Sequence, residues 1–336
     1  STILARAWEG KTRAWFSLEI ASFGGDIHFY VWTRANMRNI VEAQIYAQYP
    51  EVEVREVEDY AQQFIYDPNK TDAWTCIYEF TNKSDPYPLK TYVDYGLDRD
   101  PKEEFKNDPL ATVIETLSSI KPNETIWLQF VIRAHKKEKR FGFFSKKEDW
   151  SGEVDKLRKR FFESTKAEER RTLTNDENRI VDALHRAVQK FAFDTGIRAV
   201  YHTDKGSYDN TTVVSLRGLL RPFSASITSE LTEKGVEDDK IQKHYSAWNG
   251  FKAVGKPDFD YPWQDYKNLR GDRTKRLMID AYKRRMQFYA PHKMKSMIMT
   301  TEELATMFHF PGATVASPGI NRIPSKRSQA PNNLPV

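Results

Sequence analysis

The sequence contains a single cysteine, Cys76, among 336 residues. A disulfide bond joins two cysteines, so none can form within this chain. Proteins of oxidising compartments commonly carry paired cysteines, whereas cytosolic proteins keep their thiols reduced. We therefore expect the chain to reside in a reducing compartment.

Long apolar stretches are equally scarce. A helix that crosses a bilayer needs about 20 consecutive apolar residues, and the run IWLQFVI at residues 126–132 has only the length of a strand. The stretch STILARAWEGKTRAW at the start lacks the apolar core of a signal peptide. Apolar residues make up 39% and charged residues 29% of the sequence, which is typical of a globular protein with a solvated surface. We expect the chain as given to be soluble.

The sequence also lacks the motifs of common active sites. A phosphate-binding loop carries a glycine five residues before its Gly-Lys pair, but for WEGKT at 8–12 that position is Ala5. The seven histidines form no His-x-x-x-His pair, so zinc has no local signature. No Gly-x-Ser-x-Gly nucleophile elbow occurs. We therefore expect neither enzymatic activity nor a cofactor.

Two alternating stretches near the N-terminus predict a β-hairpin. In WFSLEIAS (15–22) every second residue is apolar, which places Ser17 and Glu19 on the opposite, polar face. DIHFYVWT (26–33) alternates in the same way. The Gly-Gly pair between the two stretches fits the positive φ angles of a tight hairpin turn.

The hairpin opens a pattern of strand, strand, helix, strand that occurs twice. A helical apolar stripe at 37–49 and a strand-like stretch at 51–60 complete the first pattern. We expect ferredoxin-like β-β-α-β units at residues 1–66 and 67–150. The second unit would consist of strands at 73–81 and 88–96, a helix at 108–120 that begins with Asp108 and Pro109, and a strand at 125–134.

The rest of the chain is less regular. Residues 151–310 are expected to form a helical and irregular α+β region. Its elements would be a helix ending near 193, a strand at 197–203, a helix at 210–223 and a helix after the capping residue Thr300 or Thr301. Residues 311–336 hold five prolines, which deny both a helix and a sheet ladder, and predict an extended Pro-rich strap or linker. The fold class is therefore α+β.

One basic and aromatic stretch, KRFGFFSK at 139–146, partly matches an RNA-recognition pattern. Arg140 replaces the first glycine of that pattern and Lys146 replaces its last aromatic residue. Stacking on bases and contacts with phosphates would fall to Lys139, Arg140, Phe141 and Phe143. The alternatives are a charged loop, or an apolar tip for a partner or membrane surface.

A second cationic region spans residues 267–295. On a helix from 273 to 289, the apolar residues would face inward and leave a basic outer surface that can follow phosphates. The candidate contact residues are Arg273, Arg276, Arg284 and Arg285. The alternative is a solubilising face, because charge alone does not select a ligand.

Several long runs resemble a known family. They include AWFSLEIASFGGDIHFYVWT, VEAQIYAQYPEVEVREVEDY, GIRAVYHTDKGSYDNTTVVSLRGLLRPF, YPWQDYKNLRGDRTKRLMIDAYKRR and MTTEELATMFHFPG. The chain resembles the region ahead of the motor in membrane-associated type IV secretion and conjugation-like ATPases of the HerA–FtsK superfamily in ultra-small bacteria. The resemblance implies that the Pro-rich strap leads into an ATPase domain beyond Val336, and that a membrane-spanning segment precedes the chain.

The resemblance implies a non-catalytic assembly or docking module on the cytoplasmic side of the cell membrane, which links a membrane anchor to a motor. Its partners would be further copies of itself and other secretion-system subunits, with membrane contact only through segments outside this chain. The alternative hypothesis is a nucleic-acid-binding module that guides DNA to the motor. A stand-alone enzyme is a third hypothesis, which the missing motifs disfavour.

Overall fold

Seven β-strands of the described residues form one antiparallel sheet in this structure, which is a computed structural model. The strand order is β2-β1-β4-β5-β3-β6, and β7 pairs with β5. The strands are β1 (Phe16–Phe23), β2 (Asp26–Trp32), β3 (Thr71–Phe80), β4 (Glu124–Ala134), β5 (Ala192–Asp204), β6 (Phe251–Val254) and β7 (Met297–Thr300). The structure describes residues 12–50, 52–81, 86–98, 108–135, 150, 152–157, 159, 175–224, 248–255 and 271–311.

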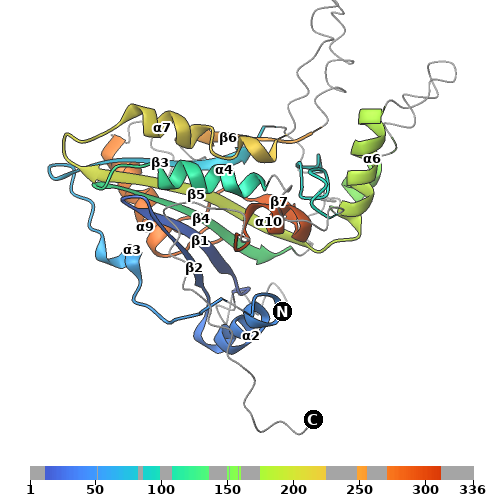
Figure 1. The fold of residues 1–336 in the computed structure, drawn as a ribbon, viewed down its shortest axis with the longest axis horizontal. Helices are drawn as coiled ribbons and strands as arrows, with labels where there is room; N and C mark the ends of the chain where they lie inside the picture. Colours follow the sequence, from blue (N-terminus) through green and yellow to red (C-terminus); the bar gives the residue numbers. More distant parts are fainter. Residues whose placement is uncertain are drawn as a thin grey trace, which may run out of the picture.

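Helices cover both faces of the sheet, which confirms the α+β class (Figure 1). They are α2 (Arg38–Gln48), α3 (Tyr60–Gln63), α4 (Pro109–Ser118), α6 (Asn175–Val188), α7 (Asn210–Arg217), α9 (Gly271–Lys283) and α10 (Thr301–Met307), with 3-10 turns η1 (Ala35–Met37) and η3 (Arg221–Phe223). The largest core cluster joins α4, α7 and α10 to one sheet face. A second cluster joins α3 and α9 to the opposite face.

Strand β5 is the centre of the sheet. It pairs with β4 along one edge, from Phe193 to Thr203. Its other edge pairs with β3 along its C-terminal part and with β7 along its N-terminal part. Segments far apart in the sequence therefore meet on this one strand.

The predicted hairpin is confirmed, and β1 and β2 pair from Ser17↔Trp32 to Phe23↔Asp26. Gly24 and Gly25 form the turn with φ angles of 60° and 100°, which side-chain-bearing residues rarely adopt. A Cβ on Gly24 would lie only 2.8 Å from the carbonyl oxygen of Pro122. Both the backbone conformation and the close approach of the next segment therefore require glycine here.

Local helix signals are confirmed as well. Asp108 caps α4 by accepting from the backbone N–H of Leu110, and Pro109 is the first helical residue. Thr300 caps α10 and forms a capping box with Glu303. The predicted helix at 210–223 corresponds to α7 with η3, and the strand at 197–203 is part of β5. The helix predicted to end near 193 corresponds to α6 but ends earlier, at Val188, because β5 already begins at Ala192.

Two predicted strands are wrong, so the structure does not confirm the repeated ferredoxin-like units. Residues 52–59 have no regular structure, because this stretch leaves α2 and crosses the sheet face instead of pairing along an edge. Residues 88–96 contain no strand: 88–91 have no regular structure and turns follow from 92, where the backbone N–H and the hydroxyl of Thr91 donate to Asp94. The Pro-rich strap lies outside the described residues from position 312 onward.

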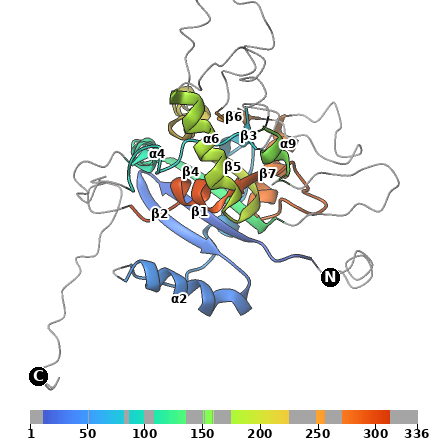
Figure 2. The same ribbon diagram turned by 90° about the vertical axis from the view of Figure 1, so that its right-hand side faces the viewer.

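Helix α2 lies apart from the rest of the fold. Figure 2 shows it beyond β2, away from the helices that cover the sheet, and none of its residues is buried. No helix in the described part of the chain combines the length and the apolar character needed to cross a bilayer.

Candidate functional site

The sheet face that carries α9 contains a row of polar side chains. Glu19 of β1, Gln129 of β4 and Arg198 of β5 are paired neighbours in the strand register. All three are at most 1% exposed. The polar face that the sequence pattern assigned to β1 is thus buried, which is costly unless every charge is compensated.

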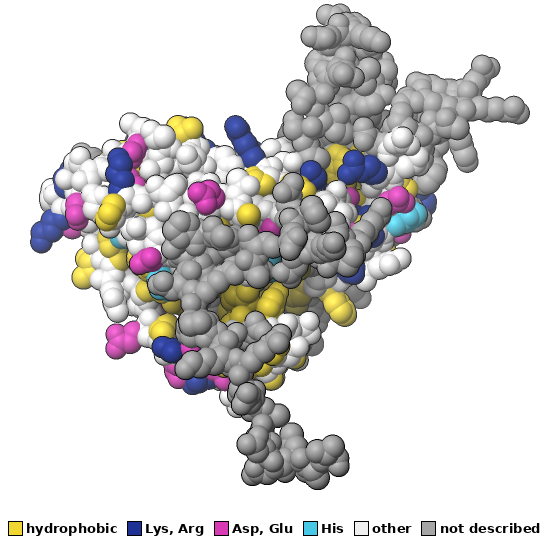
Figure 3. Space-filling view, in the orientation of Figure 1, with side chains coloured by type: hydrophobic (Ala, Val, Ile, Leu, Met, Phe, Trp, Pro, Cys, Tyr) yellow, Lys and Arg dark blue, Asp and Glu magenta, His cyan; other side chains and the backbone are white. Residues whose placement is uncertain are grey.

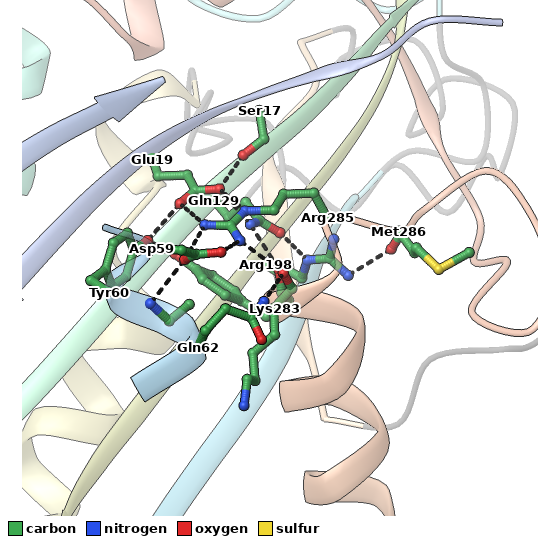
Figure 4. Close-up of polar contacts among 12 residues, drawn as sticks. Ser17, Glu19, Asp59, Tyr60, Gln62, Gln129, Arg198, Lys283, Arg285 and Met286 are labelled. Carbon is green, nitrogen blue, oxygen red and sulfur yellow. Dashed lines mark hydrogen bonds and ion pairs between the residues drawn. The ribbon is translucent and has the colours of Figure 1, made fainter. Parts of the chain in front are cut away.

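Glu19 accepts hydrogen bonds on both carboxylate oxygens (Figure 4). Its Oε1 accepts from Ser17, from Gln129 Nε2 at 2.8 Å and from Arg285 Nε at 3.0 Å. Its Oε2 accepts from the Tyr60 hydroxyl at 2.7 Å and from Arg285 Nη2 at 3.2 Å. These donors occupy both carboxylate oxygens, so neither oxygen is free to accept a hydrogen bond from a substrate.

Arg285 joins two carboxylates from different segments. Besides Glu19, its Nη1 and Nη2 donate to the two oxygens of Asp59, and Nη1 also donates to the Lys283 carbonyl oxygen at 2.8 Å. Burial opposes the charged form, but Asp59 and Glu19 outweigh it and raise the pKa of Arg285. Arg285 has a φ of 51°, a left-handed conformation that is uncommon for residues other than glycine.

Arg198 completes the charge balance of this network, which we call the polar network. Its Nε donates to Gln129 Oε1 at 2.6 Å and its Nη1 donates to the Met286 carbonyl oxygen at 2.9 Å. Burial lowers the pKa of Arg198 to about 9. The network thus contains two arginines and two acidic residues, so its formal charges balance. Arg285 contacts both carboxylates, whereas Arg198 donates to Gln129 and to the Met286 carbonyl oxygen.

The network attaches a long connection to the sheet. Residues 52–66, which we call the crossover segment, lead from α2 across the face to β3. Three further contacts hold the segment to α9: Gln62 donates to the Lys283 carbonyl oxygen at 3.0 Å, Lys283 Nζ donates to the Phe64 carbonyl oxygen at 2.9 Å, and Tyr66 donates to Asp272 at 3.1 Å.

Aromatic rings pack beneath the crossover segment. Phe64 stacks on His202 with ring centroids 3.9 Å apart, and both Tyr60 and Phe64 meet Trp127 edge-on at 5.5 Å. Burial lowers the pKa of His202 to about 4, so its imidazole is neutral at neutral pH. Among the described residues, no group of three or more His, Cys, Asp or Glu side chains is arranged to hold a metal ion.

The structure separates the predicted contact residues. Lys139, Arg140, Phe141 and Phe143 lie outside the described residues. Arg273, Arg276 and Arg284 are exposed on or just after α9. Arg284 pairs with Asp280 at 2.9 Å and Arg276 lies over the Tyr66 ring.

Arg285 is not part of this exposed basic surface. It is only 3% exposed, because the left-handed turn after α9 directs its guanidinium into the polar network. It cannot reach a phosphate backbone from that position. In Figure 3, basic and acidic side chains are interspersed over the visible face.

Sequence reasoning missed the polar network. Glu19 and Gln129 occur singly in strands, and Asp59 lies in a stretch that alternates like a strand. The local signal is one charged or amide side chain within each of two strands, which does not show whether that side chain is buried. The partner of such a residue lies far away in the sequence and is revealed only by the fold.

The comparisons with known proteins give a family but no activity. Residues 9–322 match the family model DUF8128, described as a domain of unknown function. Because that match covers most of the chain, the protein belongs to this family. No curated protein matches the chain, and no solved structure matches it either.

Proposed function

We propose that this chain is a non-catalytic docking module of a membrane-associated type IV secretion or conjugation-like translocation ATPase, and that it links a membrane anchor to the motor. The observation that carries the docking role is α2, an 11-residue helix with no buried residue. The sequence resemblance supplies the translocation context.

Among the described residues, the polar contacts of α2 are few and exposed: Arg38 pairs with Glu42 and Glu56, and the Tyr46 hydroxyl accepts from the Val54 backbone N–H at 3.4 Å. Its N-cap residue Met37 makes no side-chain capping bond, and its first turn contains no acidic residue. Isolated helices shorter than about 12 residues are marginal in water. The helix exposes large apolar side chains: Ile40 is 56% exposed, and Tyr46 and the N-cap residue Met37 are exposed too. A partner that covers Ile40 would stabilise the helix and bury apolar surface.

The polar network supports the non-catalytic part of the proposal. A general base needs a carboxylate oxygen that can accept a proton from substrate, and both oxygens of Glu19 already accept from arginine and neutral donors. Asp59 is likewise engaged by Arg285. The network therefore acts as a structural connection between the sheet and the crossover segment.

The test is self-association measured by analytical ultracentrifugation, with Ile40→Glu as the variant and Val214→Glu as the control. Val214 is 64% exposed on α7, so its substitution matches the chemistry at a site away from α2. Burying the exposed part of an isoleucine is worth roughly 1–2 kcal/mol. Ile40→Glu should therefore weaken association about tenfold or more.

The control should associate like the wild type. Equal association of all three proteins, or equal weakening by both substitutions, would remove α2 as the docking element. Of the four arginines predicted to contact nucleic acid, three are exposed, and one of these, Arg284, is already paired with Asp280.

A further inference from the structure

Three residues that follow α10 join it to other elements of the fold. They are Phe308, His309 and Phe310, and the first of them ends the helix with an extended backbone, at a φ of −142° and a ψ of 109°. In an extended segment, successive side chains point to opposite sides. The two phenylalanines therefore share one side and the histidine takes the other, and their contacts follow this division.

The two phenylalanines pack on the edge strand β2. The ring of Phe29 in β2 meets both of them edge to face, with centroids 5.8 Å from Phe308 and 5.7 Å from Phe310. Phe308 also packs against the largest core cluster. Aromatic pairs of this geometry are favourable beyond the apolar area that they bury. Phe308 thus ties the segment to the core, and Phe310 continues the contact with β2.

His309 ties the same segment to α4. Its Nε2 lies 2.8 Å from Oδ2 of Asp108, whose Oδ1 caps α4 by accepting from the Leu110 backbone N–H. Its Nδ1 lies 3.0 Å from the Ala305 carbonyl oxygen of α10. Both ring nitrogens are therefore engaged, and His309 fixes the segment on the side opposite to the phenylalanines.

Phe310 makes a further contact, to α2. Its ring meets the ring of Tyr49, the C-cap residue of that helix, edge-on with centroids 5.0 Å apart. Helix α2, which lies beyond β2 in Figure 2, follows β2 and η1 in the chain, and none of its residues is buried. A helix joined to the sheet at its start can swing about that point, so a contact at its other end restricts its direction.

We propose that residues 308–310 form a clasp that joins α2 to β2 and couples the position of α2 to the path of the chain after α10. Pro311 restricts the backbone of Phe310 to extended conformations, so the last ring of the clasp is held ready for this contact. Coupling is reciprocal: loss of the clasp frees α2, and displacement of α2 loosens the clasp. The importance of this coupling for docking rests on the proposed function.

Distances between two spin labels test the clasp in the full chain. The labels are attached through Ala43→Cys in α2 and Val214→Cys in α7, two exposed positions, whereas Cys76 is fully buried and stays unlabelled. Dilution with unlabelled protein confines the measured distances to single molecules. With the clasp intact, we expect one narrow distance distribution.

Two substitutions then remove the contact from either side. Phe310→Ala should raise the population of displaced α2 positions about fivefold and broaden the distribution, because an aromatic pair is lost. Tyr49→Ala removes the same pair from the side of α2, so the double variant should be no broader than Phe310→Ala alone. The matched control is Phe191→Ala, because Phe191 is 80% exposed in the connection from α6 to β5.

Chymotrypsin tests the coupling in the reverse direction. Cleavage of the peptide bond between Phe308 and His309 requires local opening of the clasp, so its rate follows the open population. Tyr49→Ala should raise this rate about fivefold, again through loss of the aromatic pair. Tyr46→Ala is the matched control on the same helix, since the Tyr46 side chain is 44% exposed, and it should leave the rate unchanged.

A broad distance distribution with the clasp intact, or an equally narrow one in Phe310→Ala and Tyr49→Ala, would show that the clasp does not position α2. A cleavage rate that Tyr49→Ala leaves unchanged, or that Tyr46→Ala raises equally, would overturn the coupling. Tyr49→Ala keeps the test valid if Phe310→Ala does not fold. Neither measurement records association, so the clasp can fail while α2 remains a docking element, and the reverse also holds.

Discussion

Replacing Arg285 with methionine is the sharpest test of how the polar network stabilises the fold. The substitution keeps most of the side-chain length but removes the guanidinium that serves Glu19, Asp59 and the Lys283 carbonyl oxygen. Glu19 is fully buried, so its charge would remain with only neutral donors around it. Breaking a buried ion pair on one side typically costs about 3–5 kcal/mol.

The expected loss for Arg285→Met is therefore about 3–5 kcal/mol in the free energy of unfolding. The double variant Glu19→Gln with Arg285→Met removes both buried charges of that pair and leaves Asp59 partly exposed to water. It should recover roughly 2 kcal/mol relative to the sum of the two single losses. Urea unfolding monitored by circular dichroism measures all four proteins of this cycle.

Two results would refute this reasoning. If Arg285→Met costs less than about 1 kcal/mol, the carboxylate of Glu19 does not depend on the ion pair. If the two single losses simply add in the double variant, Glu19 and Arg285 are not energetically coupled. The slope of the urea transition should be similar in all variants, because a changed slope would mean that the unfolded state or the two-state behaviour had changed.

Three other expectations concern separate parts of the chain. Burial lowers the pKa of His202 from 6.5 to about 4 in the folded state. Between these pH values the unfolded chain binds a proton that the folded chain does not bind. The free energy of unfolding should therefore fall by about 3 kcal/mol as pH drops from 6.5 to 4. His202→Phe should lack this component when urea midpoints are compared across that window. Thr300→Ala should cost about 1 kcal/mol in thermal or urea unfolding through loss of the capping box of α10, and Thr300→Ser should restore most of it. If the chain binds DNA, its affinity should fall steeply as the salt concentration rises and should depend little on DNA sequence. Charge reversal of the exposed arginines should then abolish binding. DNA binding that does not change with salt concentration would rule out this alternative. The residues to reverse are Arg273, Arg276 and Arg284.

Elements with local signals could be predicted from the sequence. The Gly24-Gly25 turn requires positive φ angles, and Asp108 with Pro109 marks the start of α4. The start of α10 was placed at Thr300 or Thr301, and the structure shows Thr300 as the cap. Each of these features depends on neighbours in the chain, which is why pattern reasoning found them.

The crossover segment shows why the rest could not be predicted. The stretch EVEVREVEDY alternates like a strand, yet residues 52–59 pair with no strand edge, and Glu53, Glu56 and Glu58 are exposed. Arg285 was assigned to a basic outer surface because its neighbours in the sequence are cationic. Its role follows instead from Glu19 and Asp59, which the fold brings from distant positions.

The position of β3 has a consequence for the order in which a growing chain can fold. Its two neighbours in the sheet are β5 and β6, which emerge much later during synthesis. Once residues up to 134 have emerged, β1, β2 and β4 can already associate, but one edge of β3 waits for β5, which ends at Asp204, and the other waits for β6, which ends at Val254. A nascent chain with an unpaired apolar strand is prone to aggregation and attracts chaperones. Ribosome-bound chains that end between 135 and 190 should therefore be the most aggregation-prone intermediates in the life of this protein.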